Sequence, residues 1–215
     1  MKRLTEFEAK KVLKKYGIPI TKEFLAKIPG DAKKYAKKIG YPVAMKIQSP
    51  DMLHKTDVGG VALNIKNEEE LLKAFERIMK NAKKHDSKAK ILGIVIQEMV
   101  SADRKCIVGS NNDLQFGPVI MFGLGGIFVE VLKDVSFRII PIERKDAKEM
   151  ISEIKTYEIL KGVRGQKPIN FRALEDTLLK VSKMVWKEKI DELDINPLFV
   201  DEKGVKAADA RIIIK

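Results

Sequence analysis

The chain has 215 residues, of which 45% are hydrophobic and 33% charged. This composition is typical of a globular protein with a substantial core, and it excludes a disordered or fibrous chain. The single cysteine, Cys106, excludes an intramolecular disulfide framework and a cysteine-rich zinc site. Because no apolar run is long enough to span a bilayer and the N-terminus lacks a signal-peptide pattern, we expect a cytoplasmic protein.

The formal net charge of +12 raises the question of nucleic acid or phosphorylated ligands as partners. Lysines outnumber arginines 34 to 8, which weakens the nucleic-acid interpretation because arginine is the better reader of bases and phosphates. The enrichment in lysine and glutamate fits a thermophile. Two rows of lysines have helical spacing, and we interpret both as solvated helix faces. They are Lys10, Lys11, Lys14 and Lys15, and Lys33, Lys34, Lys37 and Lys38.

The first half of the chain predicts alternating helices and strands. Thr5 and Glu8 have the spacing of a capping box, and an apolar helical stripe follows them as far as Gly17. A polar stretch without periodicity covers residues 49–60, and a soft domain boundary falls near residues 97–102. The apolar patterns predict helices at 31–39 and 68–84, and strands at 23–26, 42–48, 61–65 and 91–100.

The second half predicts mostly short strands. We expect strands at 105–110, 118–122, 128–132, 136–141, around 193, at 198–200 and at 205–208, and helices at 145–154 and 171–189. Because strictly alternating βαβ units are absent, the pattern does not predict a simple Rossmann fold. The chain is therefore predicted to be α+β, with largely antiparallel strands in its second half and two subdomains, 1–98 and 99–215.

Two basic side chains in the first half are candidates for chemistry. Lys46 interrupts an apolar strand, so it either faces outward or faces a cleft with an anionic partner. His54 lies in a polar stretch that ends at Gly59 and Gly60. A histidine there is either an ordinary surface residue or an acid, base or phosphate acceptor. His85 lies at a predicted helix end, where it interacts favourably with the helix dipole, and we assign it no function.

Two further constellations lie in the second half. Gly123, Gly125 and Gly126 follow a strand, where glycines serve a tight turn or let backbone amides approach a phosphate. Asp194 and Asn196 are two apart on an extended segment and share a face, and Asp209 ends a strand that pairs back towards them. These oxygen donors are those that hold Mg²⁺, although an Asx turn before a proline would need the same residues.

Several long motifs, in order, carry a resemblance to a known family. They are EAKKVLKKYGIPI, HKTDVGGV, QFGPVIMFGLGGIFVEVLKDVSFRIIP and DELDINPL. Together they resemble the β subunit of archaeal ADP-forming acyl-CoA (acetyl-CoA) synthetases, which are ATP-grasp proteins related to the succinyl-CoA synthetase β subunit. The resemblance runs along essentially the whole chain and implies an ATP-grasp fold whose two subdomains clasp a nucleotide.

The resemblance implies the reaction acyl-CoA + ADP + phosphate ⇌ acid + CoA + ATP. It makes the chain a cytoplasmic acid–thiol ligase subunit that works with a separate CoA-binding α subunit in an α₂β₂-type assembly. By resemblance, His54 is a phosphohistidine of the phosphoryl relay and Asp194 is the acid that steadies it. Asn196 and Asp209 match the Mg²⁺ ligands.

The resemblance also supplies a set of residues for ATP or ADP. Lys46 matches the lysine that holds nucleotide phosphates, and Glu98, with the backbone of Gln97 and Met99, matches the adenine-facing hinge. The glycine-rich loop and, more weakly, Arg138 and Arg164 are expected to contact phosphate. One position departs from the pattern, because Lys105 stands where the family often has an acid.

Other classes of function make different predictions. A carboxylate–amine ligase of the same fold would leave His54 without a role and give no stable phosphoenzyme. A nucleotide-binding regulatory subunit would bind Mg-nucleotide without labelling His54. A basic nucleic-acid-binding protein would use the lysine rows and lose affinity steeply with salt, but aromatic residues make up only 7% of the chain and no nucleic-acid motif is present.

Overall fold

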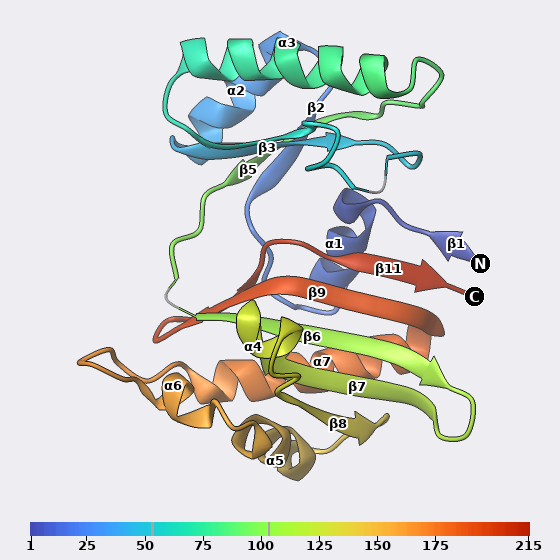
Figure 1. The fold of residues 1–215 in the computed structure, drawn as a ribbon, viewed down its shortest axis with the longest axis vertical. Coiled ribbons are helices and arrows are strands. Elements are labelled where there is room, and N and C mark those ends of the chain that lie inside the picture. Colours follow the sequence, from blue (N-terminus) through green and yellow to red (C-terminus); the bar gives the residue numbers. More distant parts are fainter. Residues whose placement is uncertain (53, 103) are drawn as a thin grey trace. The chain divides into compact units, whose positions relative to one another are not determined.

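The computed structural model describes residues 1–52, 54–102 and 104–215, and within them the chain divides into two compact units. One unit is continuous and comprises Thr21–Val100. The other is discontinuous and joins Met1–Ile20 to Ser101–Lys215. Figure 1 shows both, and each is described by itself below.

The continuous unit is a four-stranded antiparallel sheet with two helices. Its strands follow the order β2-β5-β3-β4. In Figure 1 both helices lie along one face of this sheet. Their apolar sides enclose a core with the alternate residues Val43, Met45 and Ile47 of β3. The elements are β2 (Glu23–Ala26), α2 (Pro29–Ile39), β3 (Val43–Gln48), β4 (Val61–Ile65), α3 (Glu68–His85) and β5 (Gly93–Glu98).

The discontinuous unit is built on a seven-stranded sheet. The strand order is β1-β11-β9-β6-β7-β8, with β10 also paired to β9, and every ladder is antiparallel. The strands are β1 (Lys2–Arg3), β6 (Arg104–Asp113), β7 (Gly117–Leu124), β8 (Val135–Ile139), β9 (Ile190–Asp201), β10 (Gly204–Ala207) and β11 (Arg211–Ile214).

Helices α5 and α7 pack on this sheet (Figure 1), and their apolar residues form its core together with Val108, Phe122 and Ile195. A strand alternates its side chains, so the neighbours of these core residues point to the other face. The helices of the unit are α1 (Glu6–Lys15), α4 (Ile127–Glu130), α5 (Arg144–Glu153), α6 (Tyr157–Lys161) and α7 (Phe171–Glu188).

The first twenty residues pack with the C-terminal part of the chain, which differs from the predicted subdomain of residues 1–98. The physical reason is the apolar side of α1, since Ala9 and Leu13 are buried in the core of the larger unit. Backbone pairing continues this link, because β1 pairs with β11 and Ala207 N donates to Pro19 O at 2.9 Å. The predicted boundary near residue 98 nevertheless lies close to the point between Val100 and Ser101, where the smaller unit ends and the larger unit resumes.

The α+β class and the antiparallel second half are confirmed, but three local predictions are wrong. The strand expected at 128–132 is the short helix α4, whose turn closes when Val129 N and Glu130 N donate to Gly126 O, each at 3.0 Å. The strands expected near 193 and at 198–200 are one strand, β9. Strands β1 and β11 and helix α6 were not predicted.

The capping box predicted at Thr5 and Glu8 is present, and α1 starts directly after it. Among the described residues, no helix combines the length and the apolar content that crossing a membrane requires.

Candidate functional site

His54 lies between β3 and β4, and the chain on each side of it is anchored to the smaller unit. On the N-terminal side, the Asp51 carboxylate accepts a hydrogen bond from Lys90 N at 2.7 Å. On the C-terminal side, Gly60 O accepts a hydrogen bond from Ile47 N at 2.8 Å. The side chain of His54 itself is exposed. The local structure therefore presents this imidazole to ligands on a segment held at both ends.

The two glycines after His54 are needed for that anchoring. Gly59 has φ +63°, a conformation that other residues rarely adopt, and its carbonyl accepts from Asn81 Nδ2 at 3.3 Å. A Cβ on Gly60 would lie 2.5 Å from Ile47 Cγ2 and 3.0 Å from Lys55 O. Close approach to β3 thus excludes a side chain at Gly60.

Lys46 and Gln97 lie on the sheet face opposite the two helices. Register places Lys46 against Val95 and Ala44 against Gln97, and these residues alternate with the core residues of β3. Lys46 is half-buried and Gln97 is buried. The structure therefore brings these two predicted nucleotide-binding residues to the same face.

The two residues after Gln97 end strand β5. Glu98 N donates to Lys22 O at 2.9 Å, and the Glu98 carboxylate accepts from Lys22 N at 2.8 Å. These two bonds fix the end of β5 to the start of β2. Met99 follows with an exposed side chain, as a residue at the rim of a binding site would have.

Asp194 lies in the middle of β9, between Gly109 of β6 and Arg211 of β11. Its neighbours Leu193 and Ile195 are buried in the core, so its own carboxylate points to the face that α5 and α7 leave open. Partial burial raises the pKa of Asp194, and the negative charge of Asp209 raises it further. The two carboxylates therefore lie close enough to interact.

Asn196 and Asp209 are brought together by backbone hydrogen bonding. Asn196 is exposed and lies two residues after Asp194 on the same strand. Asp209 follows the end of β10, and the preceding Ala208 N donates to Pro197 O at 3.0 Å. The predicted proximity of Asp194, Asn196 and Asp209 within the larger unit is thus supported by the fold.

The donors of this cluster fit a magnesium ion. Mg²⁺ prefers oxygen ligands and is usually held by one or two protein groups, with phosphate and water completing the shell. Asp209 supplies a carboxylate and Asn196 an exposed amide oxygen, and a cation there would relieve the repulsion between Asp194 and Asp209. In the described part of the chain, His, Cys, Asp and Glu do not gather in groups of three or more around a potential metal position.

Close packing requires glycine at two positions of the glycine-rich loop. A Cβ on Gly123 would lie 2.8 Å from Asp134 O, and one on Gly125 would lie 3.1 Å from Lys105 O. Gly125 N also donates to Lys105 O at 2.7 Å, which folds the loop onto β6. Gly126 has φ +71° and open space around its Cα, so its backbone conformation alone requires glycine.

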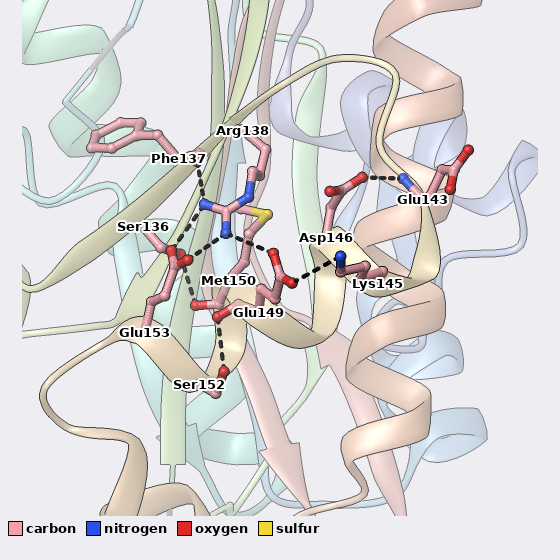
Figure 2. A network of polar contacts seen from close by, with 10 residues as sticks. All are labelled: Ser136, Phe137, Arg138, Glu143, Lys145, Asp146, Glu149, Met150, Ser152 and Glu153. Carbon is pink, nitrogen blue, oxygen red and sulfur yellow. Dashed lines mark hydrogen bonds and ion pairs between the residues drawn. The ribbon is translucent and has the colours of Figure 1, made fainter.

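Arg138 lies on β8 and faces α5 (Figure 2). Its guanidinium pairs with Glu153, and its Nη2 lies 3.4 Å from Glu149 Oε2. A third bond runs from Nη1 to the carbonyl of Phe137 at 2.8 Å. Register through β7 and β6 places Arg138 on the helix-covered face, whereas Asp194 faces the open side. The structure thus separates Arg138 from the acidic cluster.

The lysine row of α1 is the clearest correction to the sequence interpretation. Lys11, Lys14 and Lys15 are exposed as predicted, but Lys10 is fully buried, and its Nζ donates to Ala208 O at 3.2 Å. The spacing of Lys10 from Leu13 and from Glu6 places all three on one helix face. That spacing is the only sequence signal that distinguishes Lys10 from its neighbours.

The structure also shows the surroundings of Cys106 and Lys105. The thiol of Cys106 is buried, which raises its pKa to about 12 and makes it unsuitable as a nucleophile at neutral pH. Lys105, which stands where the family often has an acid, is exposed, and its Nζ lies 5.9 Å from the centre of the Phe199 ring.

The fold and these residues define a class of protein. The ATP-grasp domain family matches residues 1–214, and the chain belongs to that family.

Within the family, the chain is 56% identical over 216 residues to the β subunit of the ADP-forming acetate–CoA ligase II of Pyrococcus furiosus. The match covers 99% of this chain and 92% of that relative.

The similarity extends to solved structures of a related enzyme. An acetyl-coenzyme A synthetase 1 from Ca. Korarchaeum cryptofilum, in complex with coenzyme A and Ca-AMPCP, has a TM-score of 0.95 and 44% identity. That match covers 100% of this chain and 94% of the other. In another structure of that enzyme, with coenzyme A and Mg-AMPPCP, a phosphohistidine segment points towards the nucleotide-binding site. Its TM-score is 0.87, with 42% identity over 100% of this chain and 93% of the other.

Proposed function

We propose that this chain is the nucleotide-binding β subunit of an ADP-forming acyl-CoA synthetase. The enzyme is an acid–thiol ligase that interconverts acyl-CoA, ADP and phosphate with acid, CoA and ATP. The observation that carries the proposal is the 56% identity to an acetate–CoA ligase β subunit over nearly the whole length of both chains. Acetyl-CoA is accordingly the first substrate to test.

His54 is the phosphoryl carrier in this proposal. A neutral imidazole is a good nucleophile for a phosphoryl group near neutral pH and a good leaving group afterwards. Its exposed position on a segment anchored by Asp51 and by Gly59 and Gly60 supports this role. Asp194 is the acid that steadies the cationic phosphoimidazole.

Each unit carries residues to which we assign a nucleotide- or metal-binding role. Lys46 binds phosphate oxygens, Gln97, Glu98 and Met99 form the adenine hinge, and the amides of Gly123, Gly125 and Gly126 approach phosphate. Asn196 and Asp209 would hold Mg²⁺, which neutralises phosphate charge during phosphoryl transfer. Arg138 is assigned instead to holding α5 on β8, because two carboxylates and a carbonyl already engage its guanidinium.

A separate α subunit completes the enzyme. The Pyrococcus furiosus relative is a subunit beta, which implies a partner subunit, and the assembly we expect is of the α₂β₂ type. In this division of labour the α subunit binds CoA and the acyl group and forms the acyl phosphate. The α subunit passes the phosphoryl group through its own histidine to His54, and the β chain then transfers it from His54 to ADP.

Phosphoryl labelling tests the proposal. The purified chain, alone and with its α subunit, is incubated with Mg²⁺ and γ-labelled ATP. We expect an acid-labile, alkali-stable label that is absent from His54→Asn. The matched control is His85→Asn, because His85 is the only other histidine and lies at the far end of α3.

Each outcome has a distinct meaning. Label that persists in His54→Asn while disappearing from His85→Asn would move the carrier to the other histidine. ATP synthesis without any phosphoenzyme would favour a ligase that transfers phosphoryl directly. Nucleotide binding with neither label nor turnover, even with the α subunit present, would favour a regulatory subunit.

A further inference from the structure

Lys10 is fully buried, although it belongs to a row of lysines whose spacing predicted a solvated helix face. Helix α1 buries Ala9 and Leu13 in the core of the larger unit, and Lys10 lies between them on the buried side. Glu6, one turn earlier, is buried as well. Lysine is almost never fully buried unless its charge is satisfied, so this position has a specific cause.

The contact of Lys10 points to that cause. Its Nζ donates to the carbonyl of Ala208 at 3.2 Å, across 198 positions of the chain. This carbonyl belongs to the peptide group that joins Ala208 to Asp209. Lys10 therefore forms a hydrogen bond to the backbone directly before the proposed metal ligand.

Two more hydrogen bonds fix the same short segment. Ala207 N donates to Pro19 O at 2.9 Å, and Ala208 N donates to Pro197 O at 3.0 Å. The first bond comes from the N-terminal residues and the second from the strand that carries Asn196. The peptide that precedes Asp209 is thus held by the N-terminal segment on one side and by β9 on the other.

The charge of Lys10 also suits this place. An ammonium group removed from water requires acceptors and negative charge around it. Asp209 directly follows the bonded carbonyl, so the buried ammonium group lies beside a segment that carries a carboxylate.

We propose that Lys10 is a positioning residue that holds Asp209 in place for the divalent cation. This inference rests on the proposed function, because it assumes that Asn196 and Asp209 bind the metal. Lys10 acts through the Ala208–Asp209 peptide and does not itself touch nucleotide or phosphate. Removing its amino group should therefore weaken metal binding, even where the fold survives.

Manganese binding tests the proposal without relying on turnover. Mn²⁺ is titrated into the full chain saturated with ADP, and unbound Mn²⁺ is followed by its electron paramagnetic resonance signal. In Lys10→Met, which keeps the length of the side chain without the amino group, we expect about tenfold weaker Mn²⁺ binding. The control is Lys14→Met on the exposed side of α1, which should bind Mn²⁺ as the unsubstituted chain does.

Thermal unfolding of the same variants separates positioning from general damage. If Lys10→Met unfolds cooperatively and binds Mn²⁺ as tightly as the unsubstituted chain, the proposal is overturned. Should this variant fail to fold, Lys10→Leu replaces it, because it also lacks the amino group and keeps an apolar side chain in the buried position. The same comparison of Mn²⁺ affinities then decides.

Activity with the α subunit adds a second readout. We expect Lys10→Met to need a higher Mg²⁺ concentration for half-maximal ATP synthesis, while the KM for acetyl-CoA stays unchanged. Equal Mg²⁺ requirements would contradict the positioning role. If the unsubstituted chain neither binds Mn²⁺ with ADP nor supports ATP synthesis, the proposed function fails first, and that result is visible before any variant is compared.

Discussion

At the scale of single residues, Asp134 shows how a buried carboxylate is satisfied in this protein. Only 4% of the residue is exposed, and it lies in the loop between α4 and β8. Its two oxygens accept hydrogen bonds from Lys155 N at 2.7 Å, Thr156 N at 2.9 Å and the Thr156 hydroxyl at 2.6 Å. Burial alone would raise the pKa of Asp134, but these hydrogen bonds outweigh it and the pKa is lowered.

We therefore predict that Asp134→Asn destabilises the chain by ~1–3 kcal/mol at neutral pH, because its amide group would face a donor. Guanidinium unfolding at a series of pH values measures this. A carboxyl whose native pKa is lowered stabilises the fold above its unfolded pKa of about 3.9 and loses that contribution as pH falls through the native pKa. The difference between the two proteins should thus be constant near neutrality and shrink in acid.

Asp113→Asn is the matched control for Asp134→Asn. Asp113 accepts two backbone hydrogen bonds in the β6–β7 turn, from Gln115 N and Phe116 N, but it is exposed. Its substitution should cost less, because water replaces the lost bonds. An equal loss at both positions would show that burial of Asp134 adds nothing.

At the scale of elements, local signals and tertiary pairing explain what the sequence predicted and what it did not. Helix α1 was predicted from its capping box, and α3 from its apolar periodicity, because both signals lie within one short segment. Strand β11 becomes a strand by pairing with β9, from which β10 separates it in the sequence, and with the two-residue strand β1 at the other end of the chain. The apolar residues of α4 suit a strand as well as a helix, and the backbone at Gly126 decides between them.

The candidate site divides in the same way. Asp194, Asn196 and Asp209 were predicted as a cluster because alternation along a strand and one turn bring them together. The burial of Lys10 could not be predicted, because it depends on α1 docking against a segment 198 positions away. Arg138 was expected near phosphate from its motif, but its surroundings depend on how α5 packs on β8.

The pairing of α5 with β8 leads to a prediction for Arg138. We expect Arg138→Met to lower stability by about 1 kcal/mol, because its ion pairs are partly exposed. The KM for ADP should stay within about twofold, because Arg138 lies on the helix-covered face, away from the acidic cluster. Steady-state ATP synthesis with the α subunit measures the KM.

Arg144→Met serves as the comparison for Arg138→Met. Arg144 pairs with Glu175 at 3.1 Å and with Asp176 at 2.6 Å, so it links α5 to α7 in a similar partly exposed ion-pair network. A rise in the KM for ADP of more than tenfold in Arg138→Met, without one in Arg144→Met, would return Arg138 to the nucleotide site.

At the scale of the whole molecule, the two units have separate hydrophobic cores. Residues 21–100 form one core around β3, α2 and α3, and the other core combines α1 with the sheet of the larger unit. The N-terminal residues are therefore part of the larger unit in energetic terms, although they come first in the sequence. Residues Met1–Ile20 also hold the backbone next to the acidic cluster, through the hydrogen bonds of Lys10 and Pro19.

We predict that a fragment of residues 21–100 folds on its own, because its four strands and two helices enclose a complete core. The expected result is a cooperative thermal transition and helix–sheet circular dichroism. A chain lacking residues 1–20 should retain this transition, but its larger unit should be strongly destabilised, since Ala9, Leu13 and Ile18 leave the core. If the truncated chain instead kept the stability of its larger unit while the 21–100 fragment failed to fold, residues 1–20 would belong to the smaller unit, as the sequence pattern predicted.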